Sequence, residues 1–560
     1  MRKLLPILNW LPQYPLSHLR HDIFAGLTVG TMLIPQGMAF ALLAGMPPIA
    51  GLYAALGALL IYPLLGTSPH VAVGPVAMDS LLVAVGVSAL AVPGTPDYIS
   101  LVIILTLLVG IFQLIMGITR MGFLVNFLSQ PVINGFASAA AIIISFSQLK
   151  YLLRVEMAGS QQILTVIWRL WQHLPESHFP TLLLGLGCIA LLLALKRWKP
   201  RWPALLIVII LSTVVVWWAG LDQLGVPIVG TVPRGLPHPG VPAVDLQQIE
   251  ALAPFALTLS LVSFMEAIAI ARKFAARADQ EVDANQELVA LGVSNMMSGL
   301  LGGYSVTASF SRSAVNVQAG ARSQLALWIS ALVIILTLLF LTPLFYYLPR
   351  AALAAIVIVS VLNLVDTREP RRLYRIRKED FTVLLFAFFS TLLLGARWGL
   401  VLSIAASLIL IIRRISRPQV AILGRIPGTN IFRNIQRAPE AQEIEGLVIF
   451  RIFASLYFAN IGYLREQIRA VLRQRKDRVQ AFLLDASSIN EIDAPAIAAL
   501  EEIAHELEAR GIRFYMSNIR GPVRDVLERA GFFDKIGRDH FFYTREAAVE
   551  DFLKRQAESS

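Results

Sequence analysis

Long apolar segments separated by short polar loops fill the chain up to about residue 418. Fourteen of them are long enough for membrane helices, or for half-helices buried within protein. An even number of spans places both ends of the chain on one side of the membrane. We expect the fourteen segments at 23–42, 49–66, 73–91, 99–118, 128–149, 181–195, 204–219, 253–271, 288–303, 307–320, 325–347, 351–365, 380–395 and 398–413.

The third and the tenth of these segments are unusually short and interrupted. Val73–Asp79 contains the break Gly74-Pro75, and Thr307–Val315 follows about 230 residues later. These two segments hold equivalent positions if the fourteen segments form two halves of seven. Because each half then has an odd number of spans, the two halves are inverted relative to each other in the membrane. A glycine- and proline-rich stretch at 220–242 falls where the halves would join, and we expect it to be an exposed external loop. Paired short segments of this kind indicate a transporter whose site lies between two half-helices.

The character of the chain changes beyond this region. Gly446–Phe453 and Ala481–Asp485 are short β-type runs, and Ile461–Lys476 and Pro495–Arg510 have amphipathic helical patterns. Alternating strands and helices predict a small, soluble α/β domain. The expected organisation is a cytoplasmic N-terminus at 1–22, a transmembrane domain at 23–415, a linker at 416–440 and a cytoplasmic α/β domain at 441–557.

Composition and charge agree with a polytopic α-helical membrane protein. The chain is 56% hydrophobic and only 15% charged. Its net charge of +11 comes from Lys and Arg clusters between apolar runs, which argues against a nucleic-acid partner. Most of these cations, with Arg272 and Lys273 among them, fall in loops on the side of the termini. By the positive-inside rule we expect a multi-pass protein of the cell (inner) membrane with both termini cytoplasmic.

Other functional classes find little support in the sequence. The single cysteine, Cys188, excludes a disulfide within the chain and a cysteine-based metal site. There is no histidine cluster, phosphate-binding glycine loop or activated nucleophile pattern, so we expect neither an enzyme nor a cofactor.

Three charged residues lie in the interior of the apolar segments, away from their ends. Arg312 follows the second break and offers an anion a fixed cation beside a helix start. Its alternative role is to neutralise Glu266 or Asp79. Glu266 lies more than a turn before Arg272, where an acid is costly unless it is protonated or paired. We interpret Glu266 as a proton-binding or site-lining acid, with a structural pairing as the alternative. Asp79, one turn after Gly74-Pro75, is the weaker candidate because a helix dipole alone can stabilise it.

Several motifs together resemble the SulP family of anion permeases, relatives of the vertebrate solute carrier 26 proteins. The C-terminal domain resembles the STAS domain of that family. The resemblance covers nearly the whole chain. It rests on Pro35 to Tyr53, Gly66-Thr67-Ser68 with Val73-Gly74-Pro75, Asp283 to Leu288, and Ser309 to Asn316.

The resemblance implies fourteen spans in two inverted sevens, divided into a core domain and a gate domain, and usually a homodimer. The anion would lie between the starts of the third and tenth helices. By motif, Glu266 would be the proton-coupling acid. An aromatic residue stands at position 76 in some relatives, and Val76 implies a wider pocket here. The residues implied as lining the anion site are Gln36, Phe40, Gly74, Val76, Ser311 and Arg312.

Our leading hypothesis is a proton-coupled symporter that works by alternating access and carries an inorganic oxyanion. Sulfate is the favoured substrate. A bicarbonate or dicarboxylate transporter, or an anion exchanger, is an alternative, because one cation with two helix dipoles suits many anions. A sensor that signals through the STAS domain is an alternative of another class. The absence of a serine after Asp493 in Ile492–Pro495, where related regulatory domains are phosphorylated, argues against the sensor.

Overall fold

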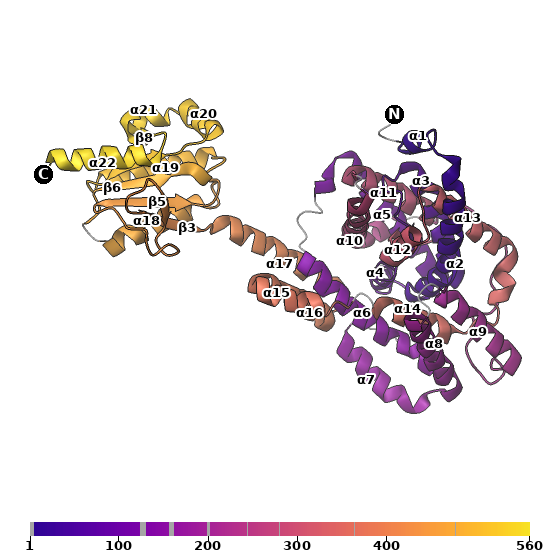
Figure 1. Ribbon diagram of the computed structural model, residues 1–560. Helices are drawn as coiled ribbons and strands as arrows, with labels where there is room; N and C mark the ends of the chain where they lie inside the picture. Colours follow the sequence, from indigo (N-terminus) through magenta and orange to yellow (C-terminus); the bar gives the residue numbers. More distant parts are fainter. Residues whose placement is uncertain are drawn as a thin grey trace. The chain divides into compact units, whose positions relative to one another are not determined.

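The computed structural model describes residues 5–123, 130–155, 162–198, 202–243, 245–278, 281–362, 365–475 and 478–559, without the side chains of residues 276–278, 396, 397, 400 and 559. The chain divides into two compact units, Met1–Ser407 and Leu408–Ser560 (Figure 1). The first part of expected segment 128–149, residues 128 and 129, lies outside the described residues.

Each of the fourteen predicted apolar segments coincides with a helix. The first seven are α2 (Leu19–Leu43), α3 (Pro48–Leu65), α4 (Ala77–Val87), α5 (Pro96–Ile118), α6 (Gln130–Leu153), α8 (Phe179–Trp198) and α9 (Ala204–Ala219). The second seven are α10 (Leu246–Ala278), α11 (Ala284–Leu300), α12 (Phe310–Gln318), α13 (Leu325–Leu336), α14 (Arg350–Val361), α16 (Lys378–Leu394) and α17 (Ala396–Ser416). The chain is thus a polytopic helical membrane protein with two inverted sets of seven segments.

The helix lengths are unequal, as the two breaks predict. Seven of the described helices are long and apolar enough to cross a membrane by length and composition, whereas α4, α9 and α14 are shorter apolar helices. Three further helices were not predicted, because they are short or polar: α1 (Ile7–Trp10), α7 (Ile163–His173) and α15 (Arg368–Ile376). One expectation was wrong. α10 continues to Ala278, so Arg272 and Lys273 lie on the helix and not in a loop.

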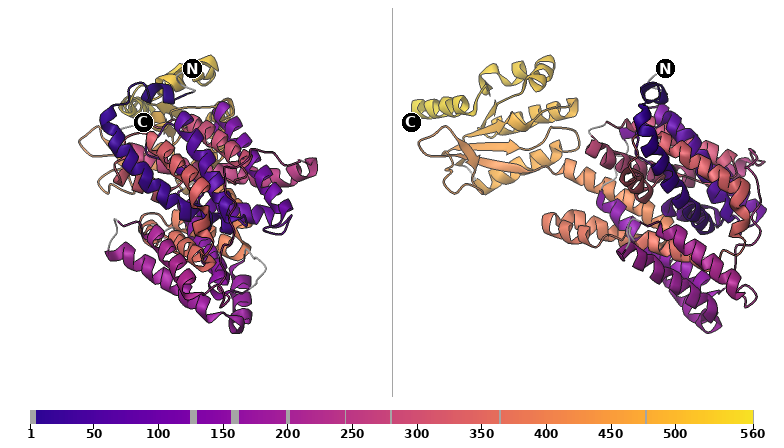
Figure 2. Two further views of the ribbon diagram at one scale, coloured as in Figure 1. Left: turned by 90° about the vertical axis from the view of Figure 1, so that its right-hand side faces the viewer. Right: turned by 45° about the vertical axis from the view of Figure 1, so that its right-hand side comes forward.

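The helices of the first unit pack in two groups. In one group, α11 contacts α3 and α5, and α13 contacts α2 and α3. In the same group, α10 contacts α5, and α12 contacts α2. In the other, α6 contacts α8, α14 and α16 (Figure 2). Small residues allow the closest crossings in the first group: a Cβ atom built on Gly51 of α3 would lie 1.9 Å from the carbonyl oxygen of Gly37 in α2. Close backbone approach of this kind favours helix association in lipid.

The second unit has a six-stranded sheet in the order β4-β3-β5-β6-β7-β8. Strands β5 (Leu447–Ile452), β6 (Ala481–Asp485), β7 (Arg513–Ser517) and β8 (Phe541–Phe542) are parallel, and β3 (Val420–Arg425) pairs antiparallel with β4 (Phe432–Asn434) and β5. The range expected as a linker, 416–440, therefore contains β3 and β4. The helices of this unit are α18 (Ile461–Arg475), α19 (Ala494–Glu508), α20 (Gly521–Arg529), α21 (Phe532–Ile536) and α22 (Arg545–Ser559).

Alternation along the strands divides the core of this unit between the two faces of the sheet. Phe450, Phe482 and Phe514 belong to the larger apolar cluster, which also includes the buried faces of α18 and α19. Leu483 and Tyr515 point to the opposite face, where α22 covers them. The two β runs and two amphipathic helices predicted here are confirmed as β5, β6, α18 and α19.

Candidate anion site

A short β pair joins the two breaks. β1 (Val73–Gly74) pairs antiparallel with β2 (Thr307–Ala308), with Val73 opposite Ala308 and Gly74 opposite Thr307. The backbone N–H of Ser309 also donates to the carbonyl of Ala72 at 3.0 Å. Helix α4 begins soon after β1 and α12 soon after β2, so the pairing brings two helix N-termini together. Free N–H groups and the helix dipole make such ends attractive to anions.

Local sequence explains both helix starts. Pro75 cannot donate to a sheet, and Val76 is the extended residue before α4. Ser309 caps α12, since its side chain accepts from the N–H of Arg312. Ser313, one turn on, accepts from the N–H of Ala72 at 2.9 Å and ties α12 back to the strand before α4.

A buried polar scaffold holds β2 in place. Asn295 of α11 bonds both backbone groups of Val306: its Nδ2 donates to the carbonyl at 3.0 Å, and its Oδ1 accepts from the N–H at 2.8 Å. Gln113 of α5 accepts from Asn295 Nδ2 at 3.0 Å and donates to Ser263 Oγ at 2.8 Å. The hydroxyl of Thr307 donates to the carbonyl of Ser263 at 2.7 Å. Sequence reasoning missed Asn295 and Gln113, although both are amides within apolar runs.

Arg312 is completely buried at this junction. Its Nη1 donates to the carbonyl of Pro75 at 2.8 Å and to Gln36 Oε1 at 3.3 Å. Its Nε and Nη2 are buried and have no hydrogen-bond acceptor among the described residues. A Cβ atom at Gly74 would lie 3.3 Å from Nη2, so glycine lets the guanidinium lie against β1. Arg312 is therefore a cation with unused donors.

Neither acid of the apolar segments forms an ion pair with Arg312. Among the described residues, Arg312 forms no ion pair within 4 Å. Glu266 is partly buried, and its Oε2 has no hydrogen-bond partner there. Asp79 of α4 is fully buried; Ser305 donates to its Oδ2 at 3.3 Å, and its Oδ1 has no partner in the described part of the chain. The alternative in which Arg312 neutralises one of these acids through a direct ion pair finds no support.

The other predicted residues differ in exposure. Gln36, Phe40 and Val76 are buried, with 3%, 5% and 6% of their surface exposed. Gln36 contacts Arg312, as described above. Ser311 is exposed, although it directly precedes the buried Arg312, and its hydroxyl lies 3.2 Å from Ser309 Oγ. The first turn of α12 thus has one open side and one buried side.

Two further sequence motifs, Gly66-Thr67-Ser68 and Asp283 to Leu288, contact each other away from this junction. Glu287 of α11 accepts from the hydroxyl of Tyr62 at 2.8 Å and from the N–H and hydroxyl of Thr67 at 2.8 and 2.6 Å. Asp283 caps α11. Glu287 therefore satisfies polar groups around the end of α3, and we assign these motifs a structural role.

An inverted helical repeat with two half-helices that meet at a short β pair is the architecture of many secondary transporters. Within that class, residues 19–387 match the Sulfate permease family and residues 438–548 match the STAS domain. The chain belongs to the sulfate permease family, whose members are transporters and not enzymes.

Three comparisons support this assignment. A probable sulfate transporter of Mycobacterium tuberculosis is 37% identical, over 98% of this chain and 99% of that protein. Sulfate transporter 4.1, chloroplastic, of Arabidopsis thaliana is 36% identical, over 98% of this chain and 83% of that protein. The structure of the murine Solute Carrier 26 family member A9 anion transporter in the inward-facing state matches with a TM-score of 0.91 at 28% identity, over 99% of this chain and 94% of that one.

Proposed function

We propose that this protein is a proton-coupled sulfate symporter that holds the anion between the N-termini of α4 and α12. The observation that carries the proposal is Arg312, whose buried guanidinium has two nitrogens without an acceptor. An unpaired buried cation is costly, and an oxyanion that accepts from Nε and Nη2 would remove that cost. The names of the relatives make sulfate the first substrate to test.

Charge balance supports proton coupling. Each helix N-terminus contributes roughly half a positive charge, so α4, α12 and Arg312 together match the two negative charges of sulfate. An ionised Glu266 or Asp79 would upset that balance in a medium where uncompensated charge is costly. We therefore propose that Glu266, and secondarily Asp79, carries the proton that accompanies the anion.

In the proposed cycle, the helices that carry the anion site move as a rigid body past the group of α6, α8, α14 and α16. Alternating access of this kind exposes a fixed site to each side in turn. We also propose a homodimer in the cell (inner) membrane with both termini cytoplasmic. A cysteine introduced by Ala557→Cys tests the topology: an impermeant maleimide should label it in inside-out vesicles and not in right-side-out vesicles.

The test of the function is radiolabelled sulfate uptake into proteoliposomes with and without an inward proton gradient. Bicarbonate, dicarboxylates and chloride serve as unlabelled competitors. Accumulation above equilibrium only with the gradient supports the proposal. Uptake of another anion in place of sulfate supports the bicarbonate, dicarboxylate or exchanger alternatives, and no transport of any anion supports the sensor.

Glu266→Gln tests the coupling residue, with Glu250→Gln as its control. Glu250 lies on the same helix and is exposed. We expect Glu266→Gln to abolish gradient-driven accumulation and to retain sulfate exchange, whereas Glu250→Gln should behave as wild type. Gradient-driven accumulation in Glu266→Gln would contradict the assignment.

A further inference from the structure

An aromatic residue begins α12 and contacts α10. Phe310, the first residue of α12, is 46% exposed and precedes Ser311. Its ring stacks on the buried ring of Phe274 in α10, with centroids 5.6 Å apart and an interplanar angle of 28°. On the same ring lies the ammonium of Lys273, with Nζ 4.3 Å from the centroid. Two consecutive residues of α10 thus meet the first residue of α12.

Lys273 has no carboxylate to neutralise it in the described part of the chain, and it is exposed. The sequence alone places it with Arg272 among ordinary loop cations. Because α10 continues to Ala278, Lys273 instead lies on that helix and contacts Phe310 at the start of α12. The buried Arg312 follows Phe310 by two residues in the same helix. The face of a phenyl ring attracts a cation weakly at an exposed position, and it leaves N–H groups of the ammonium free for another partner.

We infer that Lys273, held on the ring of Phe310, is the entry cation of the anion path: it receives the oxyanion on the side of the membrane where α10 ends and passes it to the first turn of α12. The inference rests on the proposed function. A compact ammonium on a long, flexible stem suits this role, because it can leave the ring and follow the anion. A charge at the entrance of a site chiefly changes the rate at which the ligand and the protein meet, and this effect weakens strongly as the salt concentration rises.

The experiment compares Lys273→Met with Arg272→Met in the full-length protein. The two residues are adjacent, exposed and equally charged, and only Lys273 lies on the Phe310 ring. Sulfate KM and maximal rate are measured separately from each face, in right-side-out and inside-out vesicles, at low and high ionic strength. Phe310→Leu removes the ring, and Lys273→Arg keeps the charge.

For Lys273→Met we expect the sulfate KM to rise by about threefold to tenfold on the side of the membrane where α10 ends, because electrostatic steering is lost. The maximal rate should stay within about twofold of the wild-type value. The salt dependence of KM on that face should weaken, and KM on the other face should not change. Phe310→Leu should give a smaller rise, Lys273→Arg should restore KM, and Arg272→Met should resemble wild type.

Equal effects of Lys273→Met and Arg272→Met would overturn the inference, as would the same KM change on both faces, which a structural defect would produce. Failure of the proposed function is a separate result, because the wild-type protein would then transport no sulfate on either face.

Discussion

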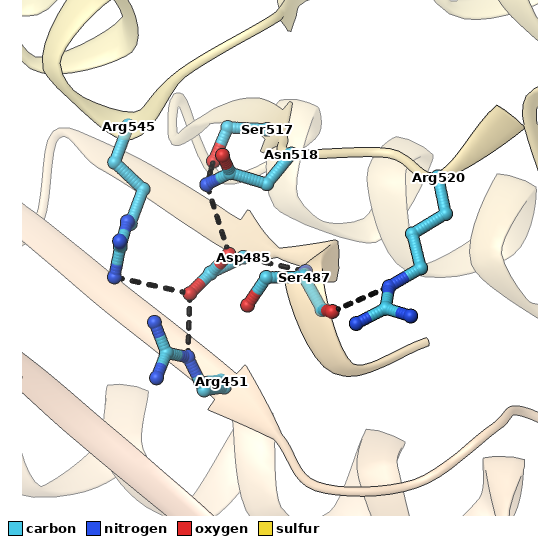
Figure 3. A network of polar contacts seen from close by, with 7 residues as sticks. All are labelled: Arg451, Asp485, Ser487, Ser517, Asn518, Arg520 and Arg545. Carbon is cyan, nitrogen blue, oxygen red and sulfur yellow. Dashed lines mark hydrogen bonds and ion pairs between the residues drawn. The ribbon is translucent and has the colours of Figure 1, made fainter. Parts of the chain in front are cut away.

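The two units of this protein each bury a charged side chain, and they satisfy it differently. In the membrane unit, Arg312 is fully buried and forms no ion pair with a described residue; its partners are the carbonyl of Pro75 and the side chain of Gln36. In the C-terminal unit, Asp485 at the end of β6 is fully buried and has two guanidinium partners: Arg451 Nε at 2.6 Å and Arg545 Nη1 at 3.5 Å from its Oδ2 (Figure 3). Its Oδ1 accepts from Asn518 Nδ2 at 3.1 Å.

The difference separates a charge whose partners lie within the chain from one that, on our proposal, a bound anion completes. Asp485 joins the carboxyl ends of β5 and β6 to the start of α22, and its oxygens are satisfied within the chain. Arg312 leaves two nitrogens unused in a medium where that is costly. The chain supplies partners to both oxygens of Asp485, whereas for Arg312 our proposal assigns the missing acceptors to an anion. Four variants test this comparison.

The largest effect should come from Arg312→Gln. We expect sulfate uptake to fall by roughly a hundredfold or more, because several charge-assisted hydrogen bonds to the anion are lost together. Thermal stability should stay the same or rise, since an unsatisfied buried cation is removed. Uptake and melting temperature of the purified protein measure the two effects. Arg322→Gln, at an exposed arginine, is the control. A variant that unfolds would assign Arg312 a structural role.

Asp485→Asn should instead lower the stability of the C-terminal unit. Removing one partner of a buried ion pair leaves the other uncompensated and costs about 3 kcal/mol or more. We expect faster hydrogen exchange in β5, β6 and β7 of the full-length protein. The control is Asp534→Asn, whose ion pair with Arg538 is exposed to solvent and should contribute far less to stability. Similar exchange in both variants would remove the distinction.

Gln36→Met should have an intermediate effect. Gln36 Oε1 accepts from Arg312 Nη1 at 3.3 Å, so the change frees a further donor and loosens the guanidinium. A hydrogen bond to a charged group is worth about 1.5 kcal/mol, which corresponds to roughly a tenfold rise in sulfate KM. Gln318→Met, at the exposed end of α12, serves as the control. Unchanged KM in Gln36→Met would show that Pro75 alone positions Arg312.

The smallest effect concerns a surface pair. Arg469 Nη2 lies 2.7 Å from Glu506 Oε1, and its hydrogen bonds lower the pKa of Glu506. A lowered carboxylate pKa contributes stability above the ordinary pKa of glutamate, and that contribution is lost as pH falls through the lowered pKa. Because the pair is exposed, Glu506→Gln should cost less than about 0.5 kcal/mol at pH 7. Hydrogen exchange in α18 and α19 at pH 7 and at acidic pH measures it, and a difference that grows toward acidic pH would contradict the sign.

The apolar pattern was sufficient to predict the fourteen membrane segments, because burial in lipid needs long runs without charge. It also predicted the two breaks, since glycine and proline act through their own backbone. It failed where structure depends on partners: β3 and β4 carry weak strand patterns and form through pairing with β5 and with each other. It also ended α10 too early, because Arg272 and Lys273 resemble loop cations unless the helix is seen to continue.

The sequence by itself determined that this protein crosses the membrane many times, that its two halves are inverted, and that Arg312 lies within the membrane part, because these features follow from local hydrophobicity and backbone chemistry. Only the tertiary structure decided what Arg312 touches, that Asn295 and Gln113 hold β2, and that Lys273 meets Phe310. These contacts join residues far apart in the chain, and their geometry follows from helix packing, which no local pattern encodes.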